Sequence, residues 1–178
     1  MAHIDTSEVI RGAIWIRPNG DALENITRLI RTMHKRAGGP QVQPHLTLLS
    51  GLETTQANAE LKLKDLAQRI KPFTVQLGEL EAHDDYFKAL IARAGPQDAL
   101  TAAQRDAYDA FEMKPAPPFE PHLSLLYGKI DEALKRELIA EAGGKLDVAF
   151  DVHAVQLVNA SQGLPVTAWK TLAEHAVG

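Results

Sequence analysis

The sequence predicts an α+β fold, because short apolar strands alternate with amphipathic helices and one octapeptide occurs twice. The copies are PHLTLLSG at 44–51 and PHLSLLYG at 121–128. Of the 178 residues, 45% are hydrophobic and 24% are charged, which is ordinary globular usage. We therefore expect one bilobal domain over residues 1–178, with one copy of the repeat in each of two pseudo-twofold-related lobes.

The first part of the chain predicts a strand, a helix, a strand and a second helix. Residues 9–17 form an apolar run that ends at a Pro-Asn-Gly turn, which is typical of a strand. A helix follows over 21–37, where apolar residues recur every three or four positions. The first octapeptide is a short strand, and the helix after it runs to residue 70. The residues that mark these helix ends are Asp21, Gly38, Gly39, Thr54, Thr55 and Pro72.

The rest of the chain predicts a hairpin, a helix, a strand, a helix and closing strands. The expected elements are a strand at 73–77, a turn at 83–85, a strand at 86–92, a helix at 96–113, a proline-rich loop at 115–118, a strand at 121–128, a helix from Asp131 to Gly143, and two more strands, the last running through Trp169 and Leu172. Period-two alternation supports the strands, and spacings of three and four support the helices.

Composition excludes several classes of function. The net charge is −4, without the basic excess that duplex nucleic acid binding needs. The chain has no cysteine, so disulfides, thiolate metal sites and cysteine nucleophiles are excluded. No apolar run reaches the roughly 18 to 20 residues of a membrane span, and the N-terminal residues carry acids where a signal peptide carries bases. We expect a cytoplasmic monomer with no cofactor and a small-molecule substrate.

The repeated octapeptide places the same chemistry on two strands. Side chains on a strand alternate between two faces, so His45 and Thr47 share one face while the leucines take the other. His122 and Ser124 repeat this arrangement. If the lobes are related by a pseudo-twofold axis, the two histidine and hydroxyl pairs meet across a cleft.

Two histidines and two hydroxyls suit in-line attack at phosphorus. One neutral imidazole takes a proton from water, one protonated imidazole gives a proton to the leaving oxygen, and the hydroxyls hold the non-bridging oxygens. Histidine titrates near neutral pH, so the pair can share one proton. This chemistry requires no metal. His83 beside Asp84 and Asp85 invites a metal interpretation, but we expect that turn to be solvated and predict no metal site.

The two motifs resemble the paired HxT/S signature of the 2H phosphoesterase superfamily. The segments GGPQVQPHLTL, YFKALIARA, PPFEPHLSLLYG and AWKTL are similar to the cyclic phosphodiesterases of plants and yeast. The resemblance implies two antiparallel-sheet lobes with outer helices around a central cleft. It also implies metal-independent opening of nucleoside 2',3'-cyclic phosphates or ADP-ribose 1'',2''-cyclic phosphate to the 2'- or 1''-monoester.

The resemblance carries over to specific residues. It implies that His45 and His122 are catalytic and that Thr47 and Ser124 hold the phosphate. Tyr127 follows the second motif as a candidate substrate contact. Trp15 matches a tryptophan near the substrate, and the sequence leaves it open between a base-stacking platform and a core residue. A first assignment makes His122 the base and His45 the acid, and the reverse assignment stays open.

Other interpretations of the same pattern remain at this point. The chain could process RNA ends, by opening a terminal 2',3'-cyclic phosphate or sealing 2',5' bonds, or it could bind cyclic nucleotides without turnover. A metal-dependent hydrolase lacks clustered carboxylates. The cations near the expected cleft strands could meet a second phosphate or be ordinary surface charges; they are Arg17, Lys88, Arg93 and Lys170. We expect a solvated helix face at Glu132, Lys135, Arg136 and Glu137.

Overall fold

The computed structural model describes residues 7–115 and 118–178. Its strands form one eight-stranded antiparallel sheet with the order β6-β3-β4-β5-β2-β1-β7-β8, so the α+β prediction is confirmed. The strands are β1 (Val9–Ile16), β2 (Leu46–Thr55), β3 (Thr74–Ala82), β4 (Leu90–Gly95), β5 (His122–Leu126), β6 (Ala149–Asp151), β7 (Ala154–Val158) and β8 (Thr171–Ala176). The helices are α1 (Gly20–Ala37), α2 (Gln56–Arg69), α3 (Gln97–Ala110) and α4 (Glu132–Glu141), with short 3-10 turns η1 (Tyr86–Lys88) and η2 (Val166–Ala168).

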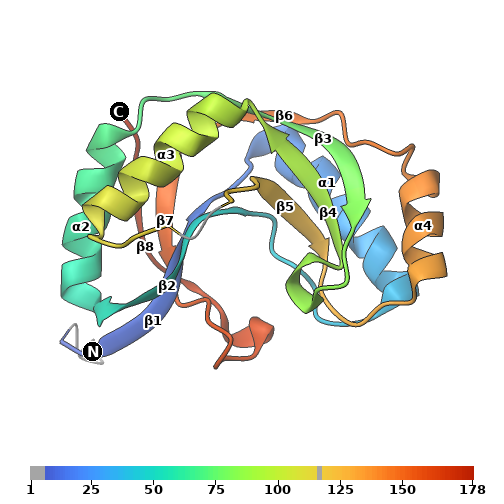
Figure 1. Ribbon diagram of the computed structural model, residues 1–178, viewed down its shortest axis with the longest axis horizontal. Helices are drawn as coiled ribbons and strands as arrows, with labels where there is room; N and C mark the ends of the chain where they lie inside the picture. Colours follow the sequence, from blue (N-terminus) through green and yellow to red (C-terminus); the bar gives the residue numbers. More distant parts are fainter. Residues whose placement is uncertain (1–6, 116–117) are drawn as a thin grey trace.

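The sheet consists of two four-stranded halves that meet at its centre. Strands β2, β1, β7 and β8 form one half, and β6, β3, β4 and β5 form the other. The halves join where β2 meets β5, through the antiparallel pair Leu46 and Leu123. The sheet curls into an arch, with α2 and α3 over one end and α1 and α4 over the other (Figure 1). The two octapeptides are therefore neighbours in the middle of the arch.

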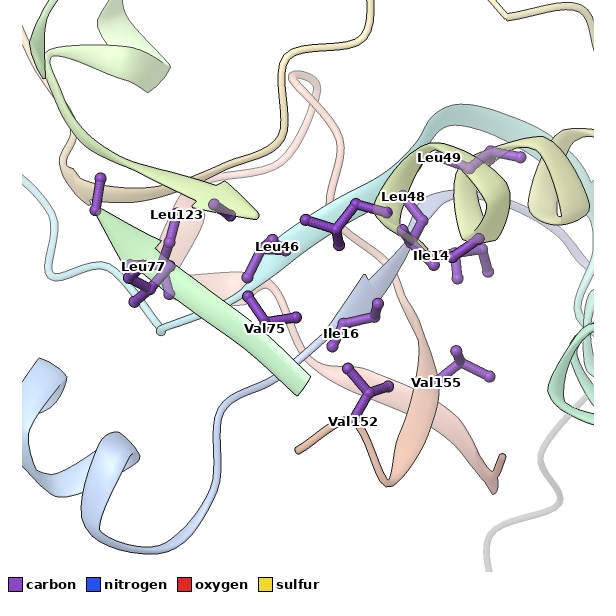
Figure 2. Packing of buried hydrophobic residues seen from close by; sticks show 14 of the residues in the cluster. Ile14, Ile16, Leu46, Leu48, Leu49, Val75, Leu77, Leu123, Val152 and Val155 are labelled. Atoms are coloured by element: carbon purple, nitrogen blue, oxygen red, sulfur yellow. The ribbon is translucent and has the colours of Figure 1, made fainter. Parts of the chain in front are cut away.

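The leucines of both octapeptides anchor these strands in the core, as the alternation predicts. Leu46 and Leu48 are buried in the first copy, and Leu123 and Leu125 in the second. Figure 2 shows Leu46 and Leu123 among the packed side chains of β1, β2 and β3. Burial of a leucine side chain stabilises the fold by roughly 1.5 to 3 kcal/mol, so the repeat is held firmly and its opposite face is left for the site.

The predicted hairpin differs from the structure in its second strand. The segment expected as a strand from residue 86 begins with the turn η1, and β4 follows at Leu90–Gly95. The cause is local, because the Asp85 carboxylate accepts a hydrogen bond from the Phe87 N–H at 2.9 Å and caps the turn. Carboxylates that bond the backbone two residues on favour turns over strands.

The last third of the chain and the start of α1 also differ from the prediction. The last third holds three strands, β6, β7 and β8, where two were predicted. Thr55 caps α2 as predicted, since its hydroxyl accepts from the Asn58 N–H at 3.2 Å. Asp21 does not cap α1, which begins at Gly20 after Asn19. Of the predicted proline-rich loop, residues 116–117 lie outside the described residues.

Lys135 is buried, so the predicted solvated face of α4 is wrong at this residue. Its side chain is 3% exposed. The ammonium donates to the His83 carbonyl at 2.9 Å and pairs with Glu132 at 2.6 Å. A buried cation needs such partners, and sequence patterning could not show that a loop covers this position. Within residues 7–115 and 118–178, no helix is long and apolar enough to cross a membrane.

Candidate active site

A cavity of about 550 Å³ lies where the two halves of the sheet meet. Five of the six site residues expected from the sequence line it, and Ser124 does not. The lining residues used below are Trp15, His45, Thr47, Phe87, Lys88, His122, Tyr127 and Trp169. The fold thus brings both motif histidines into one cavity.

Both histidines are held by the same backbone contact. Nδ1 of His45 lies 2.6 Å from the Gln43 carbonyl oxygen, and Nδ1 of His122 lies 2.7 Å from the Glu120 carbonyl oxygen. A carbonyl oxygen only accepts hydrogen bonds, so each Nδ1 carries a hydrogen and donates. Nε2 of each neutral ring is then left as a base, and after protonation it becomes an acid.

Burial favours the neutral form of both histidines, and more strongly for His45. His45 is 7% exposed, and this burial lowers its pKa to about 3, against the opposing hydrogen bond to Gln43. The nearby charges of Arg17 and His122 also lower it. The pKa of His122 is lowered mainly by burial, and to a lesser extent by Lys88, Arg93 and His83. Desolvation disfavours the cation in each case.

Trp15 packs against His45 and is not an open platform. The two rings are stacked with centroids 3.5 Å apart and planes 8° apart. Trp15 is only 2% exposed, so one of its faces is occupied by the imidazole. The stack fixes the ring plane of His45, while the hydrogen bond to Gln43 fixes its rotation. Of the two interpretations left open for Trp15, the structure favours packing.

The two motif hydroxyls have different surroundings. Thr47 is half-buried and lines the cavity. Ser124 is 6% exposed, and its hydroxyl donates to the Phe87 carbonyl at 2.8 Å. Tyr127 lines the cavity, but it is 4% exposed and burial raises the pKa of its phenol. The structure thus gives the Ser124 hydroxyl a protein partner, and the phosphate contact expected for it stays a prediction.

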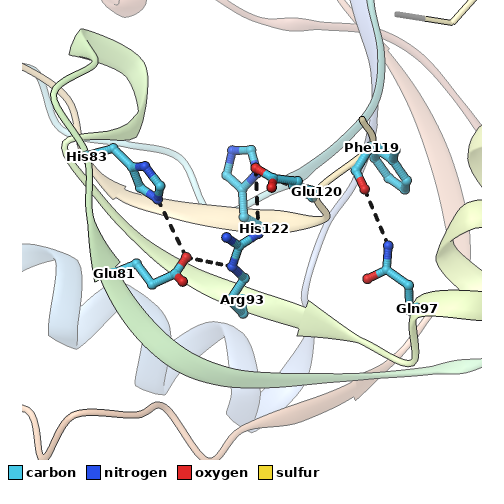
Figure 3. Close-up of polar contacts among 7 residues, drawn as sticks. All are labelled: Glu81, His83, Arg93, Gln97, Phe119, Glu120 and His122. Atoms are coloured by element: carbon cyan, nitrogen blue, oxygen red, sulfur yellow. Dashed lines mark hydrogen bonds and ion pairs between the residues drawn. The ribbon is translucent and has the colours of Figure 1, made fainter. Parts of the chain in front are cut away.

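A charged network lies beside His122 (Figure 3). The Glu81 carboxylate lies 2.5 Å from Arg93 Nε and 3.5 Å from His83 Nε2. Arg93 also lies 3.8 Å from the Glu120 carboxylate, and Glu120 supplies the carbonyl that orients His122. Arg93 therefore has protein partners, and among the four cations named from the sequence Lys88 is the one that lines the cavity.

Two aromatic residues of the cavity were not predicted as site residues. Phe87 lies in η1, and Trp169 follows η2. Their rings are 6.0 Å apart between centroids, with planes 23° apart. Trp169 lies in the AWKTL segment that already carried the resemblance, which is the signal that could have found it. Phe87 lies in the segment YFKALIARA, which also carried the resemblance, but the sequence analysis assigned it to a strand.

His83 has no metal-binding surroundings in the described chain. Its ring faces Glu81, and Asp85 instead caps the turn before Phe87. In residues 7–115 and 118–178, no group of three or more histidine or carboxylate side chains is arranged to hold a metal ion.

The fold and the doubled motif define a class of phosphoesterases with paired histidines. Residues 7–164 match the 2'-5' RNA ligase superfamily, and the chain belongs to this family of 2H phosphoesterases. A cyclic phosphodiesterase of Arabidopsis thaliana is 21% identical over 139 residues, which are 78% of this chain and 76% of that protein.

Solved structures have the same fold. The crystal structure of TT0787 from Thermus thermophilus has a TM-score of 0.64 at 18% identity and covers 94% of this chain and 98% of its own. Escherichia coli LigT complexed with 3'-AMP has a TM-score of 0.63 at 19% identity, with coverage of 96% and 99%. At these identities the likeness shows the fold alone.

Proposed function

We propose that this protein hydrolyses a small cyclic phosphate to a phosphomonoester by paired-histidine acid and base catalysis. The substrate class is nucleoside 2',3'-cyclic phosphates or ADP-ribose 1'',2''-cyclic phosphate, and the expected product of the former is the 2'-phosphate. The observation that carries the proposal is that two histidines, each with Nδ1 tied to a carbonyl, line one cavity. Two such groups are what in-line displacement at phosphorus needs.

The surroundings of the two histidines support a division of roles. His45, with a pKa of about 3, is unprotonated at cellular pH, so its Nε2 is free to act as the base. His122 is less buried and is the better carrier of the proton that the leaving oxygen receives. We therefore assign His45 as base and His122 as acid, which reverses the first assignment made from the sequence. Each role contributes about 10² to 10⁴ in rate.

The remaining polar groups of the cavity, Thr47 and Lys88, can bind the negatively charged phosphate. Thr47 lies on the same strand face as His45 and lines the cavity, so its hydroxyl can donate to a non-bridging oxygen. The Lys88 ammonium lines the same cavity and opposes the negative charge of the transition state. This chemistry uses no metal, and the proposed partner is the substrate alone, without duplex nucleic acid.

Processing of RNA ends is a second candidate function, and the extent of the cavity favours it. Besides the histidines, the cavity reaches Arg11 and Gly12 in β1 and Ser50 and Gly51 in β2. Trp15 and Arg11 are four positions apart on β1, which is roughly 13 Å in an extended strand. An oligonucleotide ending in a 2',3'-cyclic phosphate would use this length, whereas a mononucleotide would leave much of it empty.

Phosphorus NMR of 2',3'-cyclic AMP incubated with the protein in EDTA tests the proposal. We expect a 2'-monophosphate signal with wild-type protein and its loss with His45→Ala and with His122→Ala. A 3'-monophosphate signal would reverse which oxygen leaves. If the ligand survives overnight with wild-type protein, the same assay with a short RNA carrying a terminal cyclic phosphate separates the second candidate from a binding module.

A further inference from the structure

The similarity between the two repeats begins one residue before the octapeptide. Residues 43–45 read Gln-Pro-His and residues 120–122 read Glu-Pro-His. In each copy, the residue before the proline supplies the carbonyl that accepts from Nδ1 of the histidine. The proline has no N–H, so the peptide group that contains this carbonyl has no donor through which the fold can hold it. Other contacts must therefore fix the direction of the carbonyl and, with it, the imidazole.

In the first copy, the side chain of Gln43 makes such a contact. Its Nε2 donates to the Trp169 carbonyl at 3.2 Å. Trp169 lies in the connection between β7 and β8, so this hydrogen bond joins the segment before β2 to a distant part of the chain. Arg17 Nε donates to the next carbonyl, that of Pro44, at 3.4 Å. The Gln43 carbonyl is thus held by side-chain contacts on both sides of the peptide group.

In the second copy, Arg93 of β4 holds the side chain of Glu120 (Figure 3). Arg93 is the cross-strand partner of His122 in the pairing of β4 with β5. Its Nη1 lies 3.8 Å from the Glu120 carboxylate, and its Nε lies 2.5 Å from the Glu81 carboxylate. The second ion pair limits the movement of the guanidinium, so Arg93 can serve as a fixed point for Glu120.

We propose that Gln43 and Glu120 are positioning residues, and that each orients the histidine two positions later by anchoring its own carbonyl through its side chain. The inference rests on the proposed function, in which these two histidines move the protons. The two copies reach the same result with different partners, a backbone carbonyl for Gln43 and a guanidinium for Glu120. Neither residue is among those that line the cavity, so both act without touching the substrate.

Substitutions that preserve size separate this role from packing. Gln43→Glu keeps the length of the side chain but removes the donor, and Gln43→Ala removes both. Each should lower kcat on 2',3'-cyclic AMP about tenfold, with little change in KM. Glu120→Ala should cause a similar loss, whereas Glu120→Gln keeps an oxygen that accepts from Arg93 and should restore most of the rate. The matched control is Gln41→Ala, at an exposed glutamine of the same segment, which should leave kcat unchanged.

A second substrate shows whether each residue acts through its own histidine. A nitrophenyl phosphodiester of a nucleoside has a leaving group that needs no proton, so the general acid is dispensable. Glu120→Ala should recover on this substrate, as we expect for His122→Ala. Gln43→Ala should stay slow on it, as we expect for His45→Ala. If the two variants lose the same factor on both substrates, or if neither loses activity on the cyclic substrate, the inference is wrong.

NMR of the imidazole nitrogens tests the inference without turnover. In the wild-type protein, Nδ1 of both rings should carry a hydrogen that is protected from exchange with water. Gln43→Ala should speed this exchange at His45 alone, and Glu120→Ala should speed it at His122 alone. Faster exchange at both rings in either variant, or at neither ring, would overturn the inference. If the exchange pattern holds but wild-type protein leaves both phosphodiesters intact, the proposed hydrolysis alone is contradicted.

Discussion

The two halves of the site are built from the same octapeptide, yet their histidines have different surroundings. In the first half, Trp15 pairs with Thr47 across β1 and β2, and its ring stacks on His45. In the second half, the residue that pairs with Ser124 is Ile91 of β4. Duplication therefore sets the placement of the two imidazoles, while burial and nearby charges set how easily each one takes a proton.

The hydroxyls diverge for a related reason. Ser124 lies beside the turn η1, which occupies its hydroxyl through Phe87. The first motif is followed by continuous strand to Thr55, and Thr47 is left facing the cavity. A pseudo-symmetric pair of strands therefore gives one hydroxyl that lines the cavity and one that donates to a backbone carbonyl.

The largest expected effect tests which histidine is the acid. With an acyclic nitrophenyl phosphodiester of a nucleoside, the leaving group needs no proton, so a general acid is dispensable. We expect His122→Ala to lose about 10² to 10⁴ in kcat on 2',3'-cyclic AMP and to recover most of it on the nitrophenyl ester. His45→Ala should be slow on both substrates. Recovery by His45→Ala in place of His122→Ala would show that His45 is the acid and His122 the base.

The next effect is the separation of the two titrations. NMR of the histidine rings should show His45 neutral down to about pH 3 and His122 protonating at a higher pH that is still below its ordinary pKa of 6.5. The unfolded chain binds a proton at His45 near pH 6.5 while the native chain does not, so the native state should lose stability as the pH falls from 6.5 toward 3. If both imidazoles titrate at the same pH, the proposed difference in proton affinity between His45 and His122 is wrong.

A smaller effect comes from the aromatic stack on His45. Trp15→Leu removes a stack of about 0.5 to 1.5 kcal/mol and frees the imidazole plane, so kcat should fall about fivefold. The His45 titration should move with it, which a purely structural loss would not cause. Trp169→Leu removes an edge contact to Trp15 and no ring contact to His45, so it should move that titration less. An unmoved His45 titration in Trp15→Leu would contradict a positioning role.

The smallest effect concerns Lys135, whose ammonium donates to the His83 carbonyl. Lys135→Met leaves the buried His83 carbonyl without its donor, at a cost of about 1 to 3 kcal/mol. We expect a fall in Tm of about 5 °C, measured by circular dichroism. Arg136→Met lies on the exposed side of the same helix and should change the Tm by less than about 1 °C. An equal fall in Tm for both variants would show that the hydrogen bond from Lys135 to His83 does not stabilise the fold.

Much of the fold could be predicted because its signals are local. The period of the apolar residues predicted β1, α1 and α2, and the alternation in the octapeptides correctly divided each strand into a leucine face and a histidine face. Signals that depend on a distant partner were missed. Lys135 resembled a surface lysine, because the loop that covers it lies some fifty positions away. Phe87 resembled a strand residue, because it lies in an apolar run. The structure places it in a turn instead, because its N–H donates to the Asp85 carboxylate.

The sequence by itself determined which groups are candidates for the chemistry, since the repeated octapeptide places an imidazole and a hydroxyl on one face of each of two strands. Only the tertiary structure decided what those groups can do. The antiparallel pairing of β2 with β5 brought the histidines into one cavity. Deeper burial lowered the pKa of His45 further than that of His122, and the Phe87 carbonyl in η1 accepts the hydroxyl hydrogen of Ser124. Proton affinity and hydrogen-bond capacity depend on three-dimensional neighbours and burial, which an octapeptide does not carry.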